Sequence, residues 1–192
     1  GELGEIQYIY SNRLNIGKVR KEENILWSFA PHDISAILMF LGKLPKKVTC
    51  FGEAYLQKGI YDISLTTLNF PGKVKAHIFV SWLHPFKEQK LVVIGSKKMA
   101  VFDDLSDEKL FLYPHTIQWS NDIPEAVKAD REVVSVDMAE PLKVECQHFI
   151  DCVSRRILPK TDGNEGLRVL RILSAAEESL KHNSKSIFIN EK

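Results

Sequence analysis

The stretch NILWSFAPHDISAILMFLGKLP, residues 24–45, carries the pattern on which the fold prediction rests. Its apolar residues recur at i, i+3, i+4 and i+7 and so form one helical stripe, made of Ile34, Ile37, Leu38 and Leu41. We expect a largely buried helix that Ser28 caps at its N-terminus, that accepts Pro31 in its first turn, and that ends at Gly42.

Two polar residues, His32 and Asp33, stand side by side at the head of this apolar run. In the first turn of a helix, the positive end of the helix dipole disfavours the imidazolium form. A neutral imidazole can then take a proton, as a general base must. The alternative is that both side chains only satisfy the free backbone N–H groups of the helix start. On the pattern alone we favour this second interpretation, because a lone histidine carries little information.

Strand patterns flank this helix. Residues 5–16 alternate and are rich in isoleucine and tyrosine, which predicts a first strand. A series of further strands follows the helix, separated by turn signals such as FPGK and GSKK, over residues 48–56, 61–70, 73–83, 90–95, 99–104 and 109–113. Because the connections are short, most neighbouring strands should be antiparallel.

The period changes again in the last third of the chain. One apolar stripe starts near Pro141 and consists of Leu142, Cys146, Phe149, Ile150 and Val153. A second one consists of Val169, Leu170, Leu173, Ala176 and Leu180, and Asp162 with Glu165 resembles a capping box ahead of it. Residues 185–190 could return as an edge strand, and residues 122–132 form the longest linker.

These elements predict one α+β domain over residues 1–192, an open, mostly antiparallel sheet with helices on one face. The uncovered face of such a sheet would invite a partner sheet or a second domain.

Composition narrows the classes of partner. The 192 residues include 26 basic and 25 acidic side chains, so we expect no nucleic-acid partner, which would need a clustered basic surface. The longest apolar run, residues 34–41, is too short to cross a bilayer, so we expect no membrane partner. The odd, sparse set of Cys50, Cys146 and Cys152 favours a reducing compartment, and we therefore expect a cytoplasmic protein.

Motifs for cofactors and metals are missing from the sequence. It contains no G-x-G-x-x-G, no P-loop and no metal-ligand spacing, so we predict no metal site. A metal-dependent hydrolase that uses His32, Asp33 and His84 is a competing hypothesis that no spacing supports. Trp82 could line a pocket floor or only pack under the helix. Lys87 is interpreted as an edge charge, with contact to a phosphate as the alternative.

Three segments also resemble a known family, in order and over nearly the whole chain. They are IGKVRKEENILWSFAPHDISAILMFLG (16–42), GIYDISLTTLNFPGKVKAHIFVSWLHPFKEQKLVVIGSKKMAVFDD (59–104) and TDGNEGLRVLRILSAAEESL (161–180). Together they are similar to the C-terminal domain of the Gfo/Idh/MocA oxidoreductases. The PHDI helix and the GSKKMAVFDD hairpin are the most specific parts. The nearest likeness is to members that act on sugar nucleotides, such as 3-dehydrogenases of the UDP-N-acetylglucosamine type in surface-polysaccharide pathways.

The resemblance implies an NAD(P)-dependent enzyme of which this chain is the C-terminal substrate-binding and oligomerisation half. NAD or NADP would be bound mainly by an N-terminal Rossmann domain absent from this chain, so the chain alone should be inactive. His32 would be catalytic and would move the hydroxyl proton of a sugar or sugar-nucleotide substrate together with a lysine of that domain. Many relatives carry an aspartate four residues before the histidine, where this chain has Ser28.

The remaining site predictions are on the substrate side. Five residues are predicted to contribute to substrate binding: Arg13, Asn24, Ser28, Asp33 and Trp82. By the same resemblance, the exposed sheet face should form a homo-oligomer interface. The alternative function is a stand-alone, non-catalytic dimerisation or binding module of the same fold.

Overall fold

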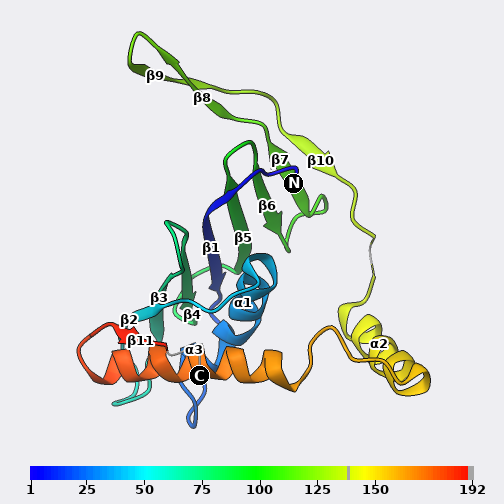
Figure 1. Cartoon of the computed structure of the whole chain (residues 1–192). Helices are drawn as coiled ribbons and strands as arrows, with labels where there is room; N and C mark the ends of the chain where they lie inside the picture. The colour runs from blue at the N-terminus through cyan, green and yellow to red at the C-terminus, as the bar shows by residue number, and fades with distance from the viewer. Residues whose placement is uncertain (138, 190–192) are drawn as a thin grey trace.

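The computed structural model describes residues 1–137 and 139–189 (Figure 1). In that part of the chain nine strands form one sheet, in the order β10-β7-β6-β5-β1-β4-β3-β2-β11. Their bounds are β1 (Ile6–Leu14), β2 (Lys47–Glu53), β3 (Ile63–Asn69), β4 (Lys75–Ser81), β5 (Glu88–Gly95), β6 (Met99–Asp103), β7 (Leu110–Tyr113), β10 (Glu132–Val134) and β11 (Ile187–Phe188). Of the strand predicted over 185–190, Asn190 lies outside the described residues.

Strand β1 lies in the middle of the sheet. It pairs in parallel with β4 on one side and antiparallel with β5 on the other, and every other pair in this sheet is antiparallel. The connection between β4 and β5, residues 82–87, therefore passes across the C-terminal end of β1. The prediction of an open, mostly antiparallel sheet is confirmed, and the crossover brings a distant loop to the end of β1.

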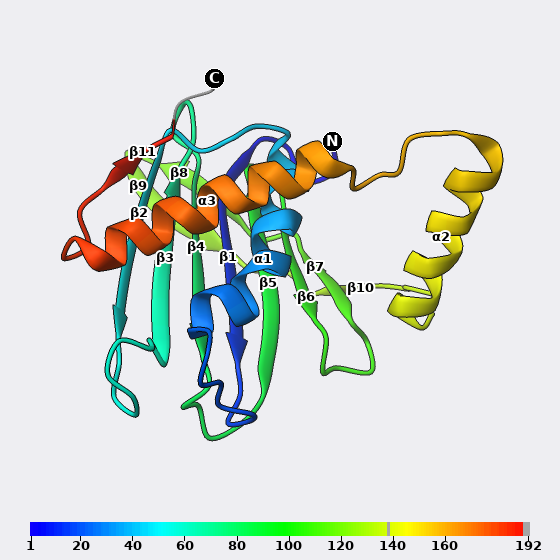
Figure 2. The ribbon, with the colours of Figure 1, turned by 90° about the horizontal axis from the view of Figure 1, so that it is seen from below.

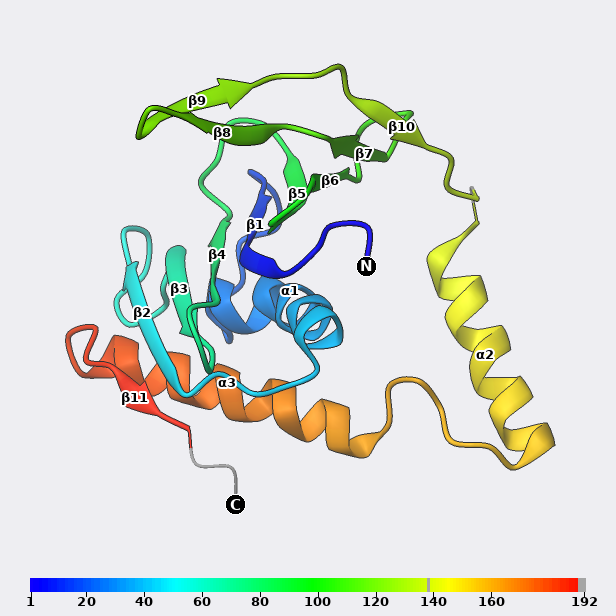
Figure 3. The same ribbon diagram turned by 45° about the horizontal axis from the view of Figure 1, so that its top comes forward.

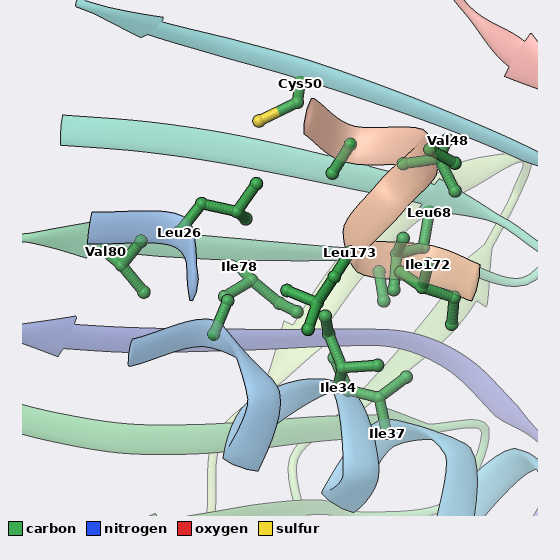
Figure 4. Close-up of a cluster of buried hydrophobic side chains, with 14 of the residues drawn as sticks. Leu26, Ile34, Ile37, Val48, Cys50, Leu68, Ile78, Val80, Ile172 and Leu173 are labelled. Atoms are coloured by element: carbon green, nitrogen blue, oxygen red, sulfur yellow. The ribbon is translucent and has the colours of Figure 1, made fainter. Parts of the chain in front are cut away.

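Two helices, α1 (Ile25–Leu41) and α3 (Gly163–Lys181), cover one face of the sheet (Figure 2). Their apolar stripes meet the inward side chains of the central strands in one cluster (Figure 4). Its members include Leu26, Ile34 and Ile37 from α1, Ile172 and Leu173 from α3, and Val48, Leu68, Ile78 and Val80 from the sheet. Burial of these side chains is the main favourable term that holds both helices on this face.

Helix α1 begins earlier than predicted, so the prediction that Ser28 caps it is wrong. The N-cap is Asn24, whose Oδ1 accepts a hydrogen bond from Trp27 N at 3.2 Å. The earlier start buries Ile25 and Leu26, which adds apolar contact that a start at Ser28 would lose. Pro31 consequently lies inside the helix, where it has no N–H to donate to the carbonyl of Trp27.

The ends of the two covering helices otherwise follow the predictions. Gly42 caps the C-terminus of α1 in the left-handed region, with φ of 64°, and its N–H donates to Leu38 O. Asp162 caps α3 by accepting a hydrogen bond from Glu165 N at 2.9 Å. Within the core, Ser179 Oγ accepts a hydrogen bond from Cys50 N at 2.9 Å, which joins α3 to β2.

Residues 116–127 and 141–155 do not pack on this body. Strands β8 (Thr116–Ser120) and β9 (Ile123–Val127) form a projecting two-stranded arm, and the third helix, α2 (Pro141–Arg155), stands apart from the sheet (Figure 3). The linker predicted over 122–132 is therefore wrong, because most of it belongs to β9 and β10. Asn121 and Asp122, with φ of 51° and 63°, form the tight turn of the arm, as primed hairpin turns require.

Candidate functional site

A small pocket lies where the C-terminal end of β1, the first turns of α1 and the start of β5 meet. Its volume is about 220 Å³. The lining residues are Arg13, Leu14, Asn15, Ser28, Phe29, His32, Lys87, Glu88 and Gln89. Three of the predicted site residues, Arg13, Ser28 and His32, are thus brought together although up to 19 positions of sequence separate them.

The topology positions each wall of this pocket. Asn15 continues β1 and donates its backbone N–H to Ser81 O at 3.0 Å, where the crossover from β4 begins. At the end of that crossover, Glu88 Oε1 accepts a hydrogen bond from Asn12 Nδ2 at 2.7 Å. These bonds fix the crossover against β1, so Lys87 is held at the rim of the pocket.

Arg13 is held in place by Asp33. The Arg13 guanidinium donates from Nε to Asp33 Oδ2 at 2.8 Å and from Nη2 to Asp33 Oδ1 at 3.2 Å. Ser11 Oγ donates to the same Asp33 Oδ1 at 2.6 Å. The Asp33 carboxylate is therefore engaged by partners inside the protein and lies below the pocket. A bidentate arrangement of this kind fixes the plane of the guanidinium, which directs the remaining nitrogen of Arg13 outward.

His32 lies on the outer side of α1 and is exposed to solvent within the pocket wall. Ser28 stands one turn before it, so the two side chains lie on the same face of the helix. Because α1 begins at Ile25, His32 is about two turns into the helix. The dipole acts mainly within the first turn, so the sequence argument for a neutral imidazole does not apply to this position.

The pocket therefore combines hydrogen-bond donors with a proton-transfer group. The guanidinium of Arg13, the amide of Asn15 and the ammonium of Lys87 can donate to hydroxyl, phosphate or carboxylate oxygens. The imidazole of His32 can give or take a proton from a hydroxyl placed beside it. Leu14 and Phe29 supply the apolar part of the wall.

Three predicted substrate-binding residues lie elsewhere. Asn24 caps α1 and lines a different hollow, next to Trp27, Gly59 and Glu177. Trp82 is fully buried, and its Nε1 donates to Asp62 Oδ1 at 2.6 Å, so it packs in the core. Asp33 holds Arg13 and is itself buried.

Sequence reasoning did not place the other polar lining residues in a site, namely Asn15, Lys87, Glu88 and Gln89. Lys87 was interpreted as an edge charge, and contact to a phosphate was kept as the alternative. The signal that could have identified it is topological, because a chain that places β4 and β5 on opposite sides of β1 must cross the end of β1.

Other parts of the described chain give weaker candidate sites. A larger hollow of about 690 Å³ is lined only by the consecutive residues Lys18 to Glu23 of one loop, so it brings no distant groups together. Within residues 1–137 and 139–189, no three His, Cys, Asp or Glu side chains are grouped closely enough to hold a metal ion. The same residues contain no helix that is both long and apolar enough to cross a bilayer.

The groups with shifted pKa values lie away from the pocket, and Cys50 and His77 are the partly or largely buried ones among them. Burial raises the pKa of the Cys50 thiol to about 11, so this thiol stays protonated and unreactive near neutral pH. Partial burial lowers the pKa of His77 below its ordinary value of 6.5. His77 lies on the open face of the sheet, where its Nδ1 is 2.7 Å from the hydroxyl of Tyr8 and its ring stacks on Tyr10.

Comparison with known proteins identifies a family model and a set of similar structures. The family model described as the GFO/IDH/MocA C-terminal domain matches residues 1–101. No curated protein matches the sequence.

Three solved structures have the same arrangement. UDP-N-acetylglucosamine 3-dehydrogenase GnnA from Acidithiobacillus ferrooxidans is 19% identical with a TM-score of 0.79, and the match covers 93% of this chain and 56% of that one. An inferred oxidoreductase from Magnetospirillum magnetotacticum is 28% identical with a TM-score of 0.76, over 91% and 56% of the two chains. An oxidoreductase from Agrobacterium radiobacter, in complex with NAD+, L-tartaric acid and magnesium, is 18% identical with a TM-score of 0.71, over 98% and 58%. The chain thus spans a little over half the length of these proteins.

Proposed function

The chain belongs to the GFO/IDH/MocA C-terminal domain family, and from that premise we propose that it is the substrate-binding half of an NAD(P)-dependent oxidoreductase acting on a hydroxyl of a sugar or sugar nucleotide. The observation that carries this proposal is the pocket in which Arg13, Ser28, His32 and Lys87 meet. It combines a proton-transfer group with several hydrogen-bond donors, which is what a polyhydroxylated or phosphorylated substrate requires.

In this proposal His32 moves the proton of the reacting hydroxyl. Arg13 binds an oxygen of the substrate with the nitrogen that Asp33 leaves free, and Asp33 keeps the guanidinium in that orientation. Ser28 stands four residues before His32, where many relatives have an aspartate, so it can donate or accept a hydrogen bond but carries no charge.

The cofactor needs a different part of the protein. The sequence contains no glycine-rich phosphate loop, so we propose that NAD or NADP is held mainly by a Rossmann domain preceding Gly1, where it would exchange a hydride with the substrate. The pocket volume of about 220 Å³ supports this arrangement, because typical ligand pockets enclose roughly 300–1,000 Å³. A second domain would supply the missing walls.

The test begins with the natural reading frame upstream of the Gly1 codon. It should encode a strand followed by G-x-G-x-x-G, and the longer protein should reduce NAD or NADP in the presence of a sugar or sugar nucleotide. His32→Ala should then lower kcat by about 10²- to 10⁴-fold, because the proton transfer is lost. The melting temperature should not change, since the side chain is exposed.

A matched control is His84→Ala, which removes a partly exposed histidine whose Nδ1 is 3.1 Å from the carbonyl oxygen of Phe86 and whose ring meets the ring of Phe86 edge-on. This variant should retain activity. An unrelated upstream domain, or full activity in His32→Ala, would refute the proposal.

A second proposal concerns assembly, and the uncovered face of the sheet favours it. Phe51, Leu65 and Phe79 lie side by side in one cross-strand row over β2, β3 and β4, on the face opposite α1 and α3. Phe51 is 56% exposed and Leu65 38%. Apolar rows of this kind are typical of surfaces that bind another protein, and we propose a second copy of the chain as that partner.

A further inference from the structure

Helix α2 is separated from the rest of the protein. In the described part of the chain, no hydrogen bond or ion pair joins Pro141–Arg155 to the sheet or to the two covering helices. Figure 3 shows the helix standing away from the body. A 15-residue helix is marginal in water without tertiary contacts, so α2 requires a surface to pack on.

The side of α2 that needs a partner can be identified. Most of its large apolar residues fall on one stripe, the α2 stripe, which consists of Leu142, Cys146, Phe149, Ile150 and Val153. Leu142, Phe149, Ile150 and Val153 are between 54% and 67% exposed. An amphipathic helix with an exposed apolar stripe is the usual form of a helix that docks into a complementary groove.

The edge of α2 that carries Cys152 and His148 is in contact with the chain that follows the helix. Ile157 N donates to Cys152 O at 3.1 Å, and Lys160 N donates to His148 Nε2 at 3.1 Å. Cys152 is buried beneath the segment that contains Ile157 and Lys160. The following chain therefore covers α2 beside Cys152 and His148, and it leaves the α2 stripe exposed.

Helix α1 also has an uncovered side, and it carries the candidate catalytic residue. Ser28, His32, Ser35 and Met39 follow one another at intervals of three or four residues, so they share one face. Met39 is 73% exposed. Ser28 and Ser35 are small, so they allow the backbone of another protein segment to approach this face closely. The pocket opens beside this face.

The N-terminus lies on the same side of the body as α2. Figure 3 marks it between α1 and α2, and Figure 2 also places it on the side of the body from which α2 stands off. A domain that precedes Gly1 would emerge at this position. The solved relatives leave about 42–44% of their length outside the match, which is enough for such a domain.

We infer that the α2 stripe binds the domain preceding Gly1 and clamps it against the face of α1 that carries His32. This inference rests on the proposed function, since the bound domain is the proposed cofactor domain. The clamp would hold the two halves of the active site together at a second contact, in addition to the covalent connection at Gly1.

The size of the α2 stripe favours an attached domain over a second copy of the chain. The stripe has five side chains, whereas a standard interface between separate proteins involves about 20–30 residues on each partner. A domain on the same chain is held at a high effective concentration, so a smaller surface is sufficient to bind it.

Hydrogen–deuterium exchange of two proteins tests the inference, the 192-residue chain and the longer natural protein. Backbone amides of residues 146–153 should exchange rapidly in the shorter chain, because helix α2 opens without a partner. In the longer protein their exchange should slow by at least about tenfold. Equal exchange in both proteins would overturn the inference.

Matched variants separate docking from folding. Phe149→Glu places a charge in the α2 stripe, and Gln147→Glu places the same charge outside it. In the longer protein, Phe149→Glu should restore rapid exchange of residues 146–153, whereas Gln147→Glu should not. Neither variant should change the melting temperature of the 192-residue chain, where both positions are exposed.

Two further outcomes distinguish the alternatives. If the 192-residue chain self-associates and Phe149→Glu alone abolishes this, a second copy fills the stripe and the inference is wrong. If the longer protein binds NAD or NADP but residues 146–153 remain unprotected, the inference fails while the proposed function stands. If no cofactor domain precedes Gly1, both fail.

Discussion

Asp33 is the residue on which the local structure of the pocket depends most. Its carboxylate accepts three hydrogen bonds, one from Ser11 and two from Arg13, and it joins α1 to β1. Removing one member of a buried charge pair leaves the other without a partner. We expect Asp33→Asn to lower the free energy of unfolding by about 2–4 kcal/mol in urea titrations of the 192-residue chain.

A double variant separates the charge from the packing. Asp33→Leu together with Arg13→Met removes both charges and keeps similar volume, so it should recover most of the stability that Asp33→Asn loses. A double variant as unstable as the single one would show that the hydrogen bonds of Ser11, rather than the ion pair, hold the helix.

His77 makes the stability of the protein depend on pH. Because partial burial lowers its pKa in the folded state below 6.5, the unfolded chain binds the proton more readily. The stabilising contribution is therefore complete above about pH 6.5 and is lost as the pH falls toward the folded pKa. Thermal unfolding should give a lower melting temperature at about pH 5.5 than at about pH 7.5.

The variant His77→Gln provides the comparison for this effect. Glutamine has no titratable proton, and it can still accept a hydrogen bond from the hydroxyl of Tyr8. The difference in melting temperature between the two pH values should be smaller in the variant. An unchanged difference would assign the pH dependence to other groups.

At the scale of elements, substitutions at the start of α1 can test which residue caps the helix. Asn24 accepts a hydrogen bond from Trp27 N, whereas Ser28 lies within the helix. We expect Asn24→Ala to destabilise the chain by about 1 kcal/mol, as the loss of an N-cap does. Ser28→Ala should change stability by less than about 0.5 kcal/mol. Chemical denaturation distinguishes the two, and the reverse order would restore Ser28 as the cap.

The same helix shows how far sequence patterns reach. Its apolar period placed the body of α1 and its end at Gly42 correctly, because both depend on neighbours in sequence. Its start was predicted four residues late, because Asn24 and Ser28 are both good capping residues. Only the core decides between them, by burying Ile25 and Leu26.

Elements that lack a core partner were harder to predict. The arm of β8 and β9 was interpreted partly as a linker, since all of its residues are exposed and no buried face supports the alternation. Helix α2 was predicted from its stripe, but the stripe alone does not tell whether the sheet or another surface covers it.

At the scale of the whole molecule, the candidate site depends on topology more than on motifs. Arg13 and Lys87 are 74 positions apart, and they meet because the crossover between β4 and β5 passes the end of β1. Strand order is not encoded in local spacing, so Lys87 could not be placed beside His32 from the sequence. For the same reason, the sequence could not decide whether Trp82 lines a pocket or packs in the core, where it is buried.

The open face of the sheet leads to a prediction for the assembled molecule. If the row of Phe51, Leu65 and Phe79 binds a second copy, the 192-residue chain should associate at micromolar concentration in light scattering. Leu65→Lys places a charge in the middle of the row, and it should shift the chain to a monomer without unfolding it, since Leu65 faces away from the core. Met39→Lys adds the same charge on the opposite side of the molecule, over α1, and should leave association unchanged. A chain that is monomeric before substitution, or that associates equally in both variants, would show that the open face is not the contact between copies.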